Sequence, residues 1–165
     1  MANKKEEYTL IAKEWLENFL KEKCSNEFKI KVILPKSNIS KLPDSEIKSV
    51  NNYTLFDFKP DVLGILTNKK TKKVELVLLN RSTSAISVKE IGEVNVYSLI
   101  LTPLYSFIVS PKGLPTEVNT LLLNESIEDS LLNYNKEKEI IILKLLENGK
   151  IDNKNIFPRR FKDYF

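Results

Sequence analysis

Histidine and cysteine are nearly missing from this sequence, and their scarcity removes several classes of chemistry. There is no histidine and a single cysteine, Cys24. Mechanisms that pair a serine or cysteine nucleophile with histidine are therefore excluded, as are an internal disulfide and zinc sites built from cysteine clusters. Any catalysis would have to use carboxylates, lysine, hydroxyl groups or an oxygen-ligated hard cation such as Mg²⁺.

Glycine and long apolar runs are scarce as well. The chain has four glycines, which form no phosphate-cradling cluster, so the P-loop and dinucleotide-binding fingerprints are excluded. No apolar run reaches the length of a membrane span, and the amino terminus lacks the pattern of a signal peptide. We therefore expect a cytoplasmic protein that does not enter a membrane.

Length and charge favour one domain with an anionic partner. The 165 residues are enough for a single domain, 1–165, with a sizeable core. Apolar residues make up 42% of the chain and charged residues 29%, as in ordinary globular proteins. The net charge of +4 favours a polyanionic partner, although lysines that merely keep the surface soluble explain it about as well.

Hydrophobic periodicity predicts an alternation of helices and strands. Residues 6–23 and 87–101 have helical spacing, and the second segment opens with a capping box, Ser87 and Glu90. One face of this helix is predicted to hold Val88, Ile91, Val94 or Asn95, Ser98 and Leu99. The remaining predicted elements are strands at 28–35, 58–66, 72–80 and 104–111, a long surface loop at 36–57 with a helical turn near 43–50, short helices at 116–125 and 126–135, and a late strand within 138–150 that runs on into a short helix.

The two strands at 58–66 and 72–80 form a predicted hairpin with a lysine-rich turn. Antiparallel pairing places Asp61 across from Leu79 or Asn80, so Asp61 and Asn80 meet on one side of the sheet at its open end. Glu75 lies about 13 Å farther along the strand, too far to share a cation with Asp61.

The order of "PD", a polar turn, an apolar strand and then "SVKEIGEVNVYSLILTPLYSFIVSPKG" resembles the PD-(D/E)XK nuclease superfamily. The resemblance covers residues from about 6 to 113. It implies an α/β fold, a restriction-endonuclease-like mixed β-sheet flanked by helices, in which a helix precedes a strand, a hairpin carries the motif, and a helix leads to a buried fourth strand. It also implies DNA as the partner and a role of the restriction or defence type.

Carried over residue by residue, only one of the family's three motif positions is retained. Asp61 matches the metal-binding Asp, whereas Leu78 stands at the Glu position and Asn80 at the Lys position. Leucine cannot ligate Mg²⁺, and asparagine cannot supply a positive charge or accept a proton. The centre is then either degenerate, or active with a carboxylate that has migrated to Glu93 (less favoured, Glu90), so that Asp61 and Glu93 would hold Mg²⁺ while Asn80 orients water.

Basic residues supply candidate DNA contacts at two places. Arg81, Lys89 and Lys112 are expected at the same end of the sheet, near the hydroxyls of residues 82–84. Arg159 and Arg160 lie in a tail whose aromatic residues either stack on bases or pack back onto the protein. A scaffold that binds protein is the alternative without DNA, and a protein partner or a homodimer is left open.

Overall fold

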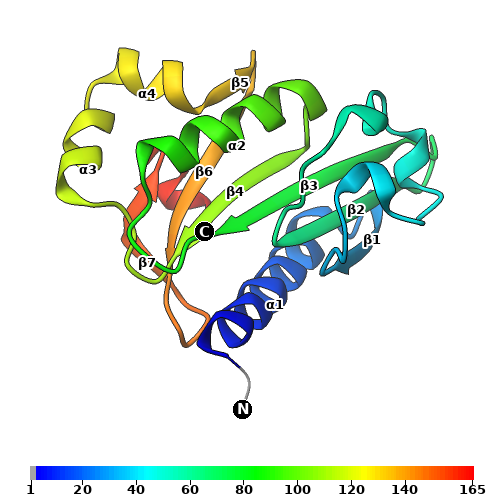
Figure 1. Cartoon of the computed structure of the whole chain (residues 1–165), viewed down its shortest axis with the longest axis horizontal. Helices are drawn as coiled ribbons and strands as arrows, with labels where there is room; N and C mark the ends of the chain where they lie inside the picture. The colour runs from blue at the N-terminus through cyan, green and yellow to red at the C-terminus, as the bar shows by residue number, and fades with distance from the viewer. Residues whose placement is uncertain (1–2) are drawn as a thin grey trace.

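The protein is described here by a computed structural model that covers residues 3–165. A mixed β-sheet forms its middle layer (Figure 1). Within the described residues the sheet has seven strands in the order β1-β2-β3-β4-β6-β5, and β7 pairs along β6. The first three are antiparallel neighbours, whereas β3, β4 and β6 run parallel. The strands are β1 Phe28–Ile33, β2 Val62–Asn68, β3 Val74–Arg81, β4 Tyr105–Ser110, β5 Asn133–Asn135, β6 Lys138–Leu145 and β7 Ile151–Phe157.

Helix α1, Lys4–Cys24, covers one face of the sheet. Asn3 caps its first turn by accepting a hydrogen bond from the backbone N of Lys5. Because apolar residues recur at helical spacing, one side of α1 is buried against the inward residues of β2, β3, β4 and β6. The buried residues of α1 are Tyr8, Ala12, Leu16, Phe19, Leu20 and Cys24.

Helix α2, Val88–Leu101, covers the opposite face and begins with the predicted capping box. Ser87 accepts from the backbone N of Glu90, and the Glu90 carboxylate accepts from the backbone N of Ser87. The predicted apolar face was partly wrong, because Val88 and Leu99 are 40% and 56% exposed. Ile91, Val94 and Ser98 are buried as predicted, and Leu101 completes the buried face.

The segment 36–57 differs from the predicted surface loop. It contains three short 3-10 helices, η1 Ile39–Lys41, η2 Ile47–Ser49 and η3 Tyr53–Leu55, and the second lies where a helical turn was expected. Its apolar residues Ile39, Ile47 and Phe56 are fully buried on the face of the β2–β3 hairpin that α2 leaves uncovered. These three side chains therefore belong to the core. The sequence did not indicate this, because the residues around them are mostly polar.

The last third of the chain adds two short helices and a second antiparallel pair. Helices α3, Thr116–Leu122, and α4, Glu125–Leu132, lie on the α2 side. The prediction of a short helix after the late strand was wrong. The chain turns at Gly149 (φ 78°) and continues from β6 into the strand β7. The tail forms η4, Arg159–Tyr164, and its aromatic residues pack back: Phe165 lies 5.4 Å from Phe19 and 6.0 Å from Trp15 between ring centroids.

The predicted fold class is confirmed as a mixed β-sheet flanked by helices on both faces. The chain passes through a helix, a strand, a hairpin, a helix and a buried parallel strand, which is the order expected for a restriction-endonuclease-like core. This order places the open end of the β2–β3 hairpin, with Asp61 and Asn80, beside the end of β4.

Candidate functional site

Asp61 joins the two strands of the hairpin at their open end. It stands in a bend just before β2, so the strand predicted from residue 58 in fact starts at Val62. Val62 pairs with Leu79, which puts Asp61 beside Asn80 as expected. The Asp61 carboxylate accepts a hydrogen bond of 2.9 Å from the backbone N of Arg81, and its other oxygen lies 3.5 Å from the Arg81 Nε.

The Arg81 side chain turns into the protein. It is 7% exposed, and its Nε donates to the Thr9 Oγ1 of α1 at 2.5 Å. Its charge lies close enough to Tyr8 to oppose the dominant effect of burial, which raises the pKa of that phenol. Tyr8 in turn donates to the carbonyl oxygen of Leu145 at 2.7 Å, between α1 and the sheet. Arg81 therefore links β3, the Asp61 bend and α1, and its backbone and Nε are used internally.

The other two positions of the motif are apolar or neutral. Leu78 is fully buried among the residues of β2, β3 and segment 36–57. Asn80, two residues later on the same side of the strand, has a buried Nδ2 that lacks a hydrogen-bond partner among the described residues. An amide donor without a partner at this depth costs free energy, so Asn80 stands out as the one polar group here without a structural use.

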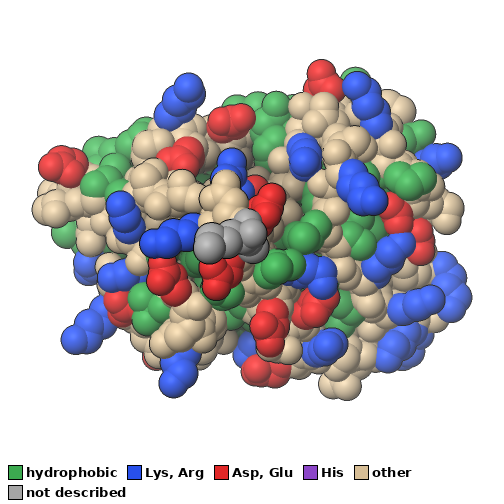
Figure 2. All heavy atoms as spheres, turned by 60° about the horizontal axis from the view of Figure 1, so that its bottom comes forward, with side chains coloured by type: hydrophobic (Ala, Val, Ile, Leu, Met, Phe, Trp, Pro, Cys, Tyr) green, Lys and Arg blue, Asp and Glu red, His purple; other side chains and the backbone are tan. Residues whose placement is uncertain are grey.

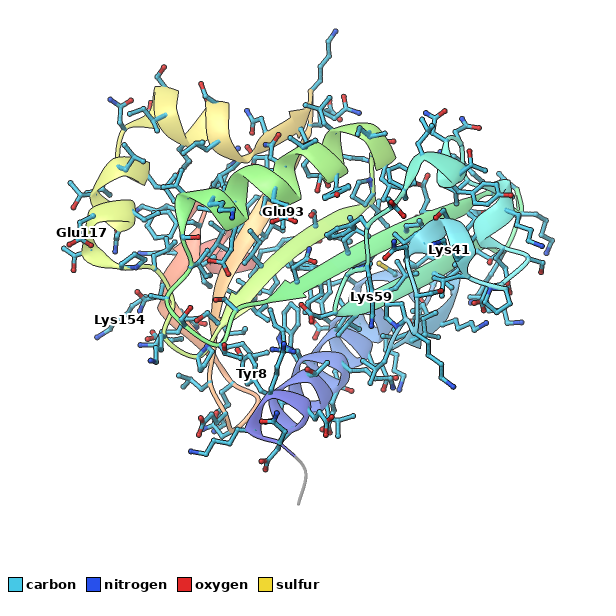
Figure 3. All side chains as sticks on the ribbon, viewed as in Figure 1. Tyr8, Lys41, Lys59, Glu93, Glu117 and Lys154 are labelled. Carbon is cyan, nitrogen blue, oxygen red and sulfur yellow. The ribbon has the colours of Figure 1, made fainter. Side chains whose placement is uncertain are left out.

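Glu93 lies on α2, in the layer opposite Tyr8 and α1 (Figure 3). It is exposed, and within the described residues it makes no hydrogen bond or ion pair. Tyr97, one turn later on the same helix face, stacks on Phe58 with ring centroids 4.1 Å apart. Glu93 thus shares the face of α2 that turns toward the segment before Asp61, but no contact joins the two carboxylates. Its role as a displaced metal ligand stays a prediction.

The donor set around Asp61 does not fit Mg²⁺. Hard cations take several oxygen ligands, with carboxylates supplying most of the charge. Here one carboxylate is available, and it already faces the guanidinium of Arg81. Among residues 3–165 there is no group of three or more acidic, histidine or cysteine side chains placed to hold a metal ion.

The candidate DNA-binding residues do not form one surface. Lys89 is exposed in the first turn of α2, and Lys112 lines an open depression of about 530 Å³ after β4. Arg159 and Arg160 line a different depression, beside α4. Arg160 is paired with Glu128 at 3.8 Å and with Glu139, and Arg159 lies 5.7 Å from the ring of Phe157.

Comparison with known proteins adds one similarity. No protein-family model matches the chain, and no match is found among curated proteins. Among solved structures, the MspJI restriction endonuclease, solved in complex with a 27-mer oligonucleotide, matches with a TM-score of 0.45 and 11% sequence identity. The match covers 82% of this chain and 25% of that one, so this chain spans about a quarter of that endonuclease's length. Similarity of this degree carries no functional inference.

Among the described residues, none of the helices combines the length and the apolar character needed to cross a bilayer.

Proposed function

We propose that this protein binds DNA with a nuclease-type fold whose metal-dependent centre is degenerate, in a restriction or defence role. The observation that carries the proposal is the use of Asp61. Its carboxylate closes the hairpin end through the backbone and guanidinium of Arg81, while the neighbouring motif position, Leu78, is sealed in the core. A centre built this way holds strands together and has no second carboxylate beside the first.

DNA as the partner follows from two supports. The order of elements agrees with the core of a superfamily that acts on DNA, which the motif order already suggested. The chain is also basic, with a pI near 9.0, and a polyanion is the partner that such a charge favours. Binding through phosphates predicts a steep loss of affinity with salt, because each phosphate contact releases counterions.

The test measures cleavage and binding on the same samples. Supercoiled plasmid is incubated with Mg²⁺ and then Mn²⁺, and a gel shift on a labelled duplex is run at about 50 and 200 mM salt. We expect a salt-sensitive shift and no cleavage with either metal. The variant Asp61→Asn serves as the control, because its amide oxygen still accepts from the Arg81 backbone while the carboxylate charge is gone.

Two results would contradict the proposal in different ways. Cleavage by the natural protein that Asp61→Asn abolishes would establish an active endonuclease, and a loss of cleavage in Glu93→Gln would then identify the displaced ligand. Absence of any DNA binding, together with salt-insensitive binding of a protein partner, would establish a scaffold.

A further inference from the structure

The net charge of the chain lies at one end of the molecule. Residues 21–29, the last turn of α1 and the start of β1, together with residues 67–75, the β2–β3 turn, contain seven lysines and three glutamates. The whole chain has 26 basic and 22 acidic residues, so the remainder has 19 of each. The net charge of +4 is therefore the excess of these two nine-residue segments, which we call the lysine end.

The fold brings the two segments of the lysine end together. Antiparallel pairing of β1 with β2 sets Lys29 opposite Thr67. The backbone N of Lys69 donates to the carbonyl oxygen of Glu27 at 2.9 Å, and the Lys69 Nζ donates to that of Ser25 at 2.6 Å. Lysine side chains gather over β1 and the neighbouring strand turn, on the right of the molecule in Figure 2.

Three of these lysines are free of any protein partner. All seven are exposed, and two of them hold acidic neighbours: Lys23 lies 3.3 Å from Glu22, and Lys73 lies 2.6 Å from Glu75. Among the described residues, no hydrogen bond or ion pair involves the ammonium groups of Lys21, Lys29 and Lys70. These three side chains are exposed to solvent.

The chemistry around the free lysines selects the kind of polyanion. No large apolar side chain of the lysine end is exposed, so the surface lacks the residues with which a protein enters a lipid layer. Phe28, its one aromatic residue, packs into the core against α1, which leaves nothing on which unpaired bases would stack. Lysine also lacks the planar fork with which arginine reads guanine, so the surface recognises phosphates without regard to sequence.

A groove continues the lysine end toward segment 36–57. The turn residues 71–73 form one wall, and residues 49–52 with the end of α2 form the other, around a volume of about 540 Å³. The side chains of Asn51, Asn52 and Thr71 add amide and hydroxyl groups of the kind that donate to phosphate oxygens.

We infer that the lysine end is the surface that contacts the sugar-phosphate backbone of duplex DNA, through Lys21, Lys29 and Lys70. This inference rests on the proposed function. It places the DNA contact at the turn of the β2–β3 hairpin, whereas Asp61 lies at the open end of the same hairpin. The degenerate centre around Asp61 and the proposed DNA-binding surface thus lie at opposite ends of β2 and β3.

The test compares two triple variants that remove the same charge. Lys21→Gln with Lys29→Gln and Lys70→Gln neutralises the free lysines, and Lys89→Gln with Lys112→Gln and Arg159→Gln neutralises the alternative residues. Affinity for a fluorescent duplex of about 30 base pairs is measured by anisotropy over a range of salt concentrations. Thermal melts confirm that both variants fold.

We expect the lysine-end variant to lose about tenfold or more in affinity at about 100 mM salt, and its salt dependence to flatten by up to about 0.9 in slope for each phosphate contact removed. The matched variant should retain affinity within about threefold. Equal losses in both variants, or a loss confined to the matched variant, would overturn the inference while DNA binding itself stands.

If the natural protein shows no salt-sensitive DNA binding, the proposed function fails first. Vesicles that contain anionic lipid are the probe for the other polyanionic surface. Binding to these vesicles that the lysine-end variant loses, with no binding to DNA, would assign the lysine end to a membrane surface and overturn the inference.

Discussion

The two ends of the β2–β3 hairpin carry charge in opposite ways. At the open end, Asp61 is paired with Arg81, and Arg81 also donates to Thr9 of α1, so the two side chains join three elements. At the turn end, Lys21, Lys29 and Lys70 are exposed, and their ammonium groups have no hydrogen-bond or ion-pair partner among residues 3–165. Charged groups that are paired within a fold already have their hydrogen-bonding partners, whereas exposed unpaired ones are available to a ligand. Asp61 therefore contacts structural partners, whereas the proposed DNA contact lies at the other end of the hairpin.

Restoring the motif at the open end is expected to have the largest effect. Leu78→Glu would place a carboxylate in a site that is 0% exposed, and burial of an unpaired charge should lower the free energy of unfolding by about 4 kcal/mol or more. Urea titration measures this loss, and Leu78→Met, with similar volume, should cost less than about 1.5 kcal/mol. A stable Leu78→Glu protein with Asn80→Lys that cleaved plasmid would show that the centre is only lightly altered.

Removing the Arg81 side chain tests the structural use of charge directly. Arg81→Met keeps the backbone N–H that Asp61 accepts but loses the Thr9 hydrogen bond and the ion pair, so we expect a loss of about 2 kcal/mol. The matched change at the turn, Lys70→Met, should alter stability by less than about 0.5 kcal/mol. If Arg81→Met left stability intact and weakened DNA binding, the assignments of the two ends would be exchanged.

The sequence predicted most of the framework because each element carries its own local signal. Helical spacing gave α1, the Ser87 and Glu90 pair gave the start of α2, and an apolar run between prolines gave the central strand β4. Pairing across the hairpin also placed Asp61 beside Asn80 correctly. Segment 36–57 was mistaken for a surface loop because three isolated apolar anchors in a polar stretch have no period.

The contacts of the candidate site residues depend on the direction of each side chain, which the spacing of residues in the sequence does not predict. Nothing in the sequence tells that the Arg81 guanidinium turns toward Thr9, 72 positions earlier, in place of solvent. Nor does it tell that Arg160 is paired with Glu128 and Glu139. The lysine end was easier to predict in part, since the sequence itself indicates a hairpin with a lysine-rich turn. Its size appears only when the fold sets the end of α1 beside that turn.

Substitution of Asn80 by leucine is expected to change the free energy of unfolding less than the substitutions of Leu78 and Arg81, and to raise it. Because its Nδ2 is buried without a partner, Asn80→Leu should raise the free energy of unfolding by about 1 kcal/mol. Asn80→Asp, in contrast, sets a second carboxylate beside Asp61 and should lower the melting temperature, with a partial recovery in Mg²⁺. Destabilisation by Asn80→Leu would contradict the idea of an idle amide, and would indicate that the group serves a ligand or a bound water at the open end.

The smallest effect concerns an ammonium at the turn end that, unlike Lys70, is partly buried. Lys138 donates to the carbonyl oxygen of Thr102 at 3.1 Å, and burial is the main cause that lowers its pKa below the ordinary value, with Lys73 adding to it and Glu75 opposing it. The unfolded chain therefore binds more protons between the lowered pKa and 10.5, so this group makes the protein more stable as pH rises through that window.

Lys138→Gln removes this dependence. The free energy of unfolding of the natural protein, minus that of the variant, should grow as urea titrations move from pH 7 toward pH 10.5, because the folded state sheds a charge that it holds unfavourably. Lys70→Gln, which removes one exposed lysine at the same end of the hairpin, is the matched control for the loss of one charge. A difference that shrinks with pH would mean that the charged form of Lys138 is favoured in the folded state, and the turn end would then share the internal use of charge found at Arg81.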